Sequence, residues 1–112
     1  MLRVSGADGK RSAAFVYGIN GRRAMPWGVG GTSVLCVAAP TQRVGFGVTT
    51  GTNAACDGLF ALDWNAWAAA NPAALGIASA AGRFFQVQAW MRDPTAPKAS
   101  SLSNAFEFVA LP

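Results

Sequence analysis

The sequence predicts an all-β fold, an antiparallel β-sandwich of about six short strands with one helical turn near residues 65–75. Apolar side chains alternate between two faces in segments 58–64, 84–91 and 104–111, which is the period of a strand. Gly, Pro and Asn residues separate these segments, as expected of turns. The 112 residues suit one domain with a real core. We therefore expect one domain over 13–112, with 1–12 a loop or a truncated edge.

Each expected strand ends at a turn signal. The first strand stops at Gly18, before the Asn20-Gly21 turn dipeptide, and the second is closed by Pro40. Residues 18–32 are expected to be irregular, and the last two strands to pair antiparallel across a loop at 93–103. The expected strands are 13–17, 33–38, 43–48 (weak), 58–64, 84–91 and 104–111. This order is typical of an Ig-like or jelly-roll-like sandwich.

The segment 65–75 is Ala-rich and predicts one or two helical turns. Asp63 and Asn65 are both possible N-caps, and Asn71-Pro72 should break the helix. A helix this short is marginal alone, so it must pack on the sheet.

Composition excludes several classes of function. Without His the chain has no His-based acid–base chemistry, and two Cys cannot form a four-Cys zinc site, so we expect no cofactor and no metal. Nine Lys and Arg against five Asp and Glu give a net charge of +4. The arginines are dispersed, which argues against a nucleic-acid partner. No apolar run is long enough for a membrane span.

Charged residues make up 12%, about half the usual share, which is common in extracellular β-proteins. The N-terminus has no apolar stretch of a signal peptide. We therefore expect a secreted or outer-surface location as part of a longer precursor, with Met1 starting a fragment.

Cys36 lies in the second expected strand and Cys56 just before the strand at 58–64. A disulfide, two buried free thiols and a reactive thiol are the three possible states, and no His is present to activate a thiolate. We expect the disulfide. It would close a loop of about 20 residues and stabilise the fold by roughly 3 kcal/mol.

Four segments carry a resemblance to a known kind of domain: 30–37 (GGTSVLCV), 56–58 (CDG), 86–94 (QVQAWMRDP) and 102–105 (LSNA). In this order they resemble an uncharacterised β-rich domain near the C-termini of large secreted or cell-surface proteins of environmental bacteria. The resemblance implies a larger parent protein and no established activity. The chain departs from it in lacking further N-terminal sequence with Cys, and in ending Ala110-Leu111-Pro112 without a Cys.

Two alternatives to a purely structural module depend on particular side chains. A sugar-stacking platform would use Trp27, Trp67 and Tyr17 if they faced water, whereas Phe15, Phe60, Phe106 and Phe108 are expected in the core. A small hydrolase would need Asp63 and Asp93 to face each other across a cleft. Both carboxylates are better explained as caps, of the helical turn and of the Asp-Pro turn. A calcium site on Asp57, Asp63 and Asp93 lacks a recognisable loop motif.

The sequence thus favours a non-catalytic extracellular or cell-surface β-sandwich module with a structural, adhesive or anchoring role. Its expected partners are other domains of the parent protein, and a polysaccharide or another cell-surface component. Carbohydrate binding and hydrolysis remain the alternatives.

Overall fold

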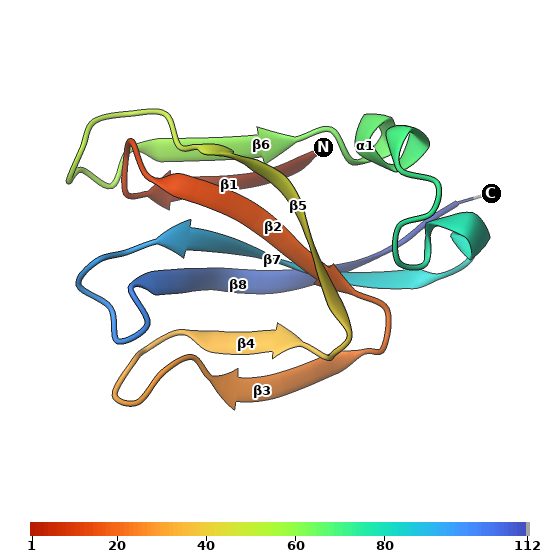
Figure 1. Ribbon diagram of the computed structural model, residues 1–112, viewed down its shortest axis with the longest axis horizontal. Helices are drawn as coiled ribbons and strands as arrows, with labels where there is room; N and C mark the ends of the chain where they lie inside the picture. Colours follow the sequence, from red (N-terminus) through yellow and green to blue (C-terminus); the bar gives the residue numbers. More distant parts are fainter. Residues whose placement is uncertain (112) are drawn as a thin grey trace.

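The computed structural model describes residues 1–111 and confirms the all-β, antiparallel prediction (Figure 1). One short α-helix and one 3-10 turn lie between the sixth and the seventh strand. The elements are β1 (Leu2–Ala7), β2 (Ser12–Gly18), β3 (Arg22–Pro26), β4 (Val34–Val37), β5 (Thr41–Val48), β6 (Gly58–Leu62), α1 (Trp64–Ala70), η1 (Ile77–Ser79), β7 (Phe84–Arg92) and β8 (Ser100–Val109). The expected antiparallel pairing of the last two strands is confirmed.

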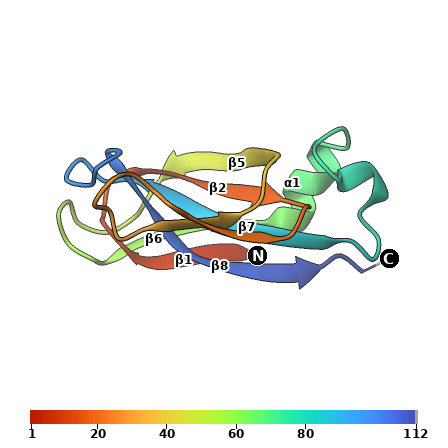
Figure 2. The same cartoon turned by 90° about the horizontal axis from the view of Figure 1, so that it is seen from below.

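The strands form one large and two small sheets. The large sheet has the order β5-β2-β7-β8, and the two small ones are β1-β6 and β3-β4. Figure 2 shows β1 and β6 on one side of β2 and β5, with α1 at one end of the layers. The β1-β6 pair is therefore the second layer of the sandwich, and it has only half as many strands as the sheet it faces.

The core lies between these two layers and follows the strand alternation. Ala13, Phe15 and Tyr17 of β2 point into it, as do Phe85 and Val87 of β7, and all five are buried. The β1-β6 layer contributes buried Leu2 and Phe60, and the Phe60 ring stacks on Phe15 with ring centroids 5.4 Å apart. Burial of these large apolar side chains is the main force that joins the two layers.

The β3-β4 hairpin covers the opposite face of β7. Gln86 and Gln88 alternate with the core residues of β7, so their side chains leave the sheet on that other face, where both are buried. The Gln88 side-chain oxygen accepts a hydrogen bond from Cys36 N at 3.1 Å, and its amide donates to Val34 O at 2.7 Å. The Gln86 oxygen accepts from Gly21 N at 3.0 Å. These bonds satisfy buried polar groups and anchor the hairpin.

Asp63 is the N-cap of α1, and its carboxylate accepts a hydrogen bond from Ala66 N at 3.1 Å. This confirms the capping role expected for Asp63, whereas Asn65, the other candidate, lies within the helix. The helix ends at Asn71, immediately before Pro72, as the sequence predicted. Trp64 is buried against the sheet, which supplies the packing that so short a helix needs.

Several segments differ from their expected structure. The loop expected at 93–103 ends at Ala99, because Ser100–Ser103 already belong to β8. Trp64, expected at the end of the strand over 58–64, is the first residue of α1. Leu2–Ala7 form strand β1, paired with β6, where residues 1–12 were expected to be a loop or a truncated edge. Arg22–Pro26 form β3, paired with β4, within a stretch expected to be irregular. The side chains of β3 are all exposed, so no alternation marks this strand in the sequence.

Candidate functional site

The second layer ends at β1 and leaves part of β8 uncovered. Phe106 pairs with the buried Val87 and Phe108 with the buried Phe85, so both phenylalanines point to the core side of the sheet. Phe106 is nevertheless 44% exposed, because β1 and β6 do not extend over it. The expectation that Phe106 belongs to the closed core is therefore wrong. Phe108 is partly buried and packs on the core cluster.

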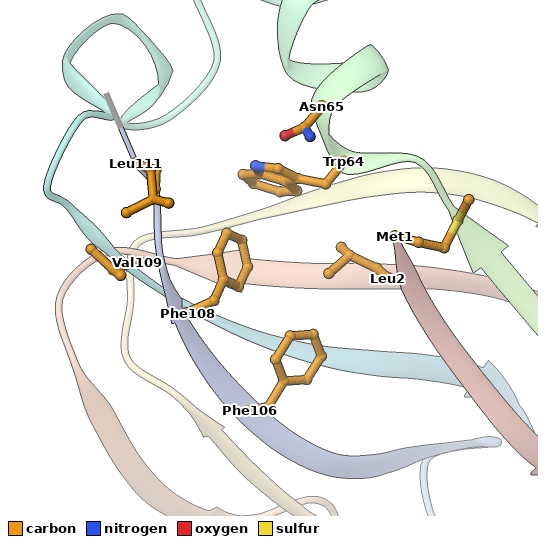
Figure 3. A pocket seen from close by; sticks show the side chains of 9 residues that line it. Met1, Leu2, Trp64, Asn65, Phe106, Phe108, Val109 and Leu111 are labelled. Atoms are coloured by element: carbon orange, nitrogen blue, oxygen red, sulfur yellow. The ribbon is translucent and has the colours of Figure 1, made fainter.

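A cleft of about 490 Å³ occupies the uncovered region between β1, β8 and the start of α1 (Figure 3). In this view Leu2, Trp64, Phe106 and Phe108 come from three elements and point toward the same space. The volume is in the range of small-ligand pockets. Its lining residues, nearly all apolar, are Met1, Leu2, Trp64, Asn65, Phe106, Phe108, Val109, Ala110 and Leu111.

A second cavity of about 210 Å³ shares Phe106 with the first and continues it along β1 and β8. It is more polar. Its lining residues are Arg3, Val4, Ser5, Phe15, Ala89, Ser103, Asn104 and Phe106. The two cavities together form an elongated depression between the two strands, which we call the β1–β8 cleft.

The apolar end of this cleft has a well-packed aromatic floor. The Trp64 ring meets Phe108 edge-on at 5.3 Å and Phe85 at 5.2 Å, and Phe85 stacks on Phe108 at 5.5 Å. Tyr17 lies beneath Trp64, with ring centroids 5.0 Å apart. Aromatic pairs in these arrangements are individually stabilising. The floor is therefore formed by the fold itself and does not depend on an occupant.

Arg3 is the one charged residue among the described residues that line the two cavities, and it alternates with the core-facing Leu2 and Val4, so its side chain lies on the outer face of β1 at the rim of the cleft. It is exposed, and the cavity linings include no carboxylate. The cleft therefore combines an apolar end at Phe108 with a cationic side chain at its polar end.

Tyr17, one of the residues predicted to bind a ligand, lies in the core and not on an exposed surface. It is fully buried, and its hydroxyl donates a hydrogen bond to Leu75 O at 2.8 Å. Burial raises the pKa of Tyr17 to about 12. Trp67 meets the Tyr17 ring edge-on at 5.8 Å and is half-buried. The two residues form part of one packed cluster rather than a flat row open to water.

Trp27 lies elsewhere, in the connection between β3 and β4. Its indole N–H donates to Ser100 Oγ at 3.0 Å, and the Lys98 amino group lies 4.0 Å from the ring centroid. A cation at this distance over a tryptophan face is attracted to it. A polar cavity of about 270 Å³ adjoins Trp27, with Ser33, Asp93 and Ser101 in its lining. The structure thus does not bring Trp27, Trp67 and Tyr17 together.

Cys36 and Cys56 are not bonded to each other, which overturns the expected disulfide. Cys36 lies in β4, beside Gln88 on the outer face of β7. Cys56 is exposed in the loop before β6, next to Ala55, whose carbonyl accepts a hydrogen bond from Gly9 N. Cys36 belongs to the β3-β4 sheet, whereas Cys56 lies in the loop that leads into β6 of the β1-β6 sheet, on the other face of β7. The loop at Thr49–Ala55 is anchored by backbone hydrogen bonds instead.

Asp63 and Asp93 do not face each other. Asp63 caps α1, where Trp64 contacts Phe85 at the start of β7, whereas Asp93 follows the far end of that strand. At about 3.3 Å per residue the strand separates them by roughly 25 Å, beyond the spacing of a glycosidase pair. Asp93 accepts hydrogen bonds from Ser101 and Thr95, which lower its pKa. It therefore holds the turn after β7.

Among residues 1–111 no three His, Cys, Asp or Glu side chains lie close enough to hold a metal ion, and no helix is long and apolar enough to cross a membrane. Sequence reasoning missed Leu2, Phe106 and Arg3 as cleft residues. The alternation placed Phe106 on the core face correctly, but it carries no signal of where the covering layer ends. Comparisons of the chain with protein-family models, with curated proteins and with solved structures find no match.

Proposed function

We propose that this domain is a non-catalytic β-sandwich module of a secreted or cell-surface protein, with a structural, adhesive or anchoring role. The observation that carries the proposal is the β1–β8 cleft, where Phe106 is open to solvent beside a preformed aromatic floor. Exposed apolar surface of this kind marks a site of contact with another molecule or domain. The cleft is thus where the module holds its partner, which is another domain of a larger parent protein or a cell-surface component.

The carboxylates support a role without catalysis, because each makes a bond that maintains the fold. Asp8 pairs with Arg11 at 3.0 Å, and Asp57 accepts from Thr52 N at 2.8 Å. Asp63 and Asp93 cap α1 and a turn, as described above. Glu107 accepts from Gln86 at 2.8 Å and pairs with Arg22 at 3.1 Å, and these bonds lower its pKa.

Carbohydrate binding at Trp27 is the second candidate function. The observation in its favour is the adjoining cavity, which places serine and threonine hydroxyls and the Asp93 carboxylate beside a tryptophan ring. Sugar sites combine an aromatic face with such polar groups. Lys98 covers part of the ring, so a sugar would have to compete with this amino group.

The cleft is tested with an anionic naphthalene dye that fluoresces on apolar surfaces. We expect the folded domain to bind it, and Phe106→Gln to weaken binding about tenfold, because the substitution places an amide in the apolar end of the cleft. The matched control is Phe46→Gln, since Phe46 is 65% exposed on β5 and lines neither cavity. It should bind the dye as the wild type does.

Equal dye binding by both variants would contradict the proposal, provided that circular dichroism shows both to be folded. A glycan array probed with the wild type and with Trp27→Ala decides the second candidate. Binding to a polysaccharide that Trp27→Ala abolishes and Phe106→Gln leaves intact would favour carbohydrate recognition over the cleft.

A further inference from the structure

Both strands that border the β1–β8 cleft have an unpaired edge. Among the described residues β1 pairs with β6 alone, and β8 pairs with β7 alone. An edge strand presents a row of backbone N–H and C=O groups that are ready to bond another strand. The second layer stops at β1, whereas the four-stranded sheet that it faces continues to β8. A strand added to β1 would therefore extend the second layer over the uncovered part of β8.

We propose that the occupant of the cleft is an extended strand from another polypeptide segment, apolar at alternate positions and acidic at a position opposite Arg3. This inference rests on the proposed function and names its partner. Backbone bonds to the edge of β1 would supply affinity, and alternate side chains would enter the apolar end of the cleft. The strand would cover Phe106, whose exposure has no role in the isolated fold.

Charge argues for the acidic residue and against a second copy of this chain. Arg3 is exposed at the rim of the polar cavity, with no carboxylate in the lining. Each copy of the chain carries a net charge of +4, so two copies repel each other. A partner with an Asp or Glu facing Arg3 gains an ion pair at the border of the cleft and is guided to it in solution.

The experiment is a selection from a phage-displayed library of random peptides on the immobilised domain. We expect enriched peptides that alternate apolar residues, contain Asp or Glu and lack central Pro, because Pro removes a backbone donor. Synthetic copies should lose about tenfold in affinity for Phe106→Gln and for Arg3→Glu. They should bind Phe46→Gln and Arg43→Glu within about twofold of the wild type. Arg43 is exposed in β5, at the opposite edge of the large sheet from β8, and lines no cavity that includes Phe106, so its reversal matches the change in net charge.

A charge-reversal pair makes the test specific to Arg3. Replacing the acidic residue of a selected peptide with Lys should weaken binding to the wild type and restore it to Arg3→Glu. Methylating alternate backbone nitrogens along one edge of the peptide should abolish binding, because a strand pairs through these groups.

Several outcomes would overturn this inference. They are the absence of any enriched peptide, full binding of the methylated peptides, and equal affinity for Arg3→Glu and the wild type.

Gel filtration with light scattering should give a monomer for both wild type and Arg3→Ala. A wild-type dimer that Phe106→Gln dissociates would show that a second copy fills the cleft. If Arg3→Ala forms a dimer and the wild type does not, the role of Arg3 is only to keep the edge of β1 from pairing with a second copy, and the inference is overturned. Dye binding in the cleft without peptide enrichment would leave the proposed function standing and remove the strand.

Discussion

At the scale of single residues, Tyr17 explains how the segment after α1 is attached to the sheet. Its ring lies at the centre of the aromatic cluster, in contact with Trp64, Trp67 and Phe85. Its hydroxyl donates to Leu75 O, so the one polar atom of the side chain is satisfied within the core. The residue therefore joins the interior of β2 to the irregular segment that leads to η1.

This burial predicts a loss of stability in alkali. The pKa of Tyr17 is raised from the ordinary 10.0 to about 12, so the folded state holds the phenolic proton more tightly than the unfolded state does. The resulting contribution to the free energy of unfolding is complete below pH 10 and is lost as the pH rises toward 12. We expect urea unfolding to show that the difference in stability between wild type and Tyr17→Phe shrinks over this range.

Tyr17 is the only tyrosine of the chain, so ultraviolet absorbance of tyrosinate reports its ionisation alone. The titration should have its midpoint well above that of the unfolded protein in urea. A native titration that coincides with the unfolded one, or parallel stability curves for the two proteins, would contradict the assignment.

At the scale of elements, alternation predicted the strands that line the core and failed where no alternation exists. Gly58–Leu62 and Phe84–Arg92 lie where the pattern placed them, because their large side chains meet the opposite layer. Arg22–Pro26 could not be recognised, since all its side chains face water and its partner is fixed by backbone bonds and buried glutamines. Gln86 and Gln88 share one face of the strand in the sequence pattern, and only the tertiary structure shows that a hairpin covers that face.

The candidate site could not be predicted from the sequence, for a related reason. Phe106 and Phe108 have the same chemistry and the same place in the alternation, yet only Phe106 is substantially open to solvent. The difference depends on how far β1 extends, which is a property of pairing between residues distant in the chain. The local alternation of apolar residues carries no information on how far β1 extends over β8.

The N-cap of α1 gives a test at this scale. Asp63→Ala should lower the free energy of unfolding by about 0.5–2 kcal/mol, because Ala66 N loses its acceptor. Asp63→Asn keeps a capping oxygen and should restore most of the loss. The matched control is Asn65→Ala, two residues along in the first turn of the helix. Chemical denaturation measures all three variants, and a larger effect at Asn65 than at Asp63 would show that the cap is misassigned.

At the scale of the whole molecule, the fold is held together without a covalent link between its sheets. Cys36 and Cys56 are free, and the layers are joined by the aromatic core and by the two buried glutamines of β7. The stability of the domain is therefore independent of the redox state of its surroundings.

We expect a reducing agent to leave the thermal midpoint of the monomer unchanged. Native alkylation should modify the exposed Cys56 faster than the half-buried Cys36, and mass spectrometry without reduction should find two free thiols. Cys56→Ser serves as the control, since it removes the fast phase and should not alter the midpoint. A monomer lighter by the two hydrogens of an oxidised pair, with a midpoint that falls on reduction, would restore the disulfide.

The pairing of β1 with β6 also sets an order of events during synthesis. Leu2 is opposite Leu62, and Ala13 of β2 is opposite Met91 of β7, so the first two strands to be made find these partners only after much of the chain has followed. Contacts between such distant residues slow folding, because long loops must close before any pairing energy is gained. The nascent N-terminal half can build only the local β2–β5 and β3–β4 pairings. The sandwich therefore closes late, and its apolar residues stay accessible to chaperones until the C-terminal strands have been translated.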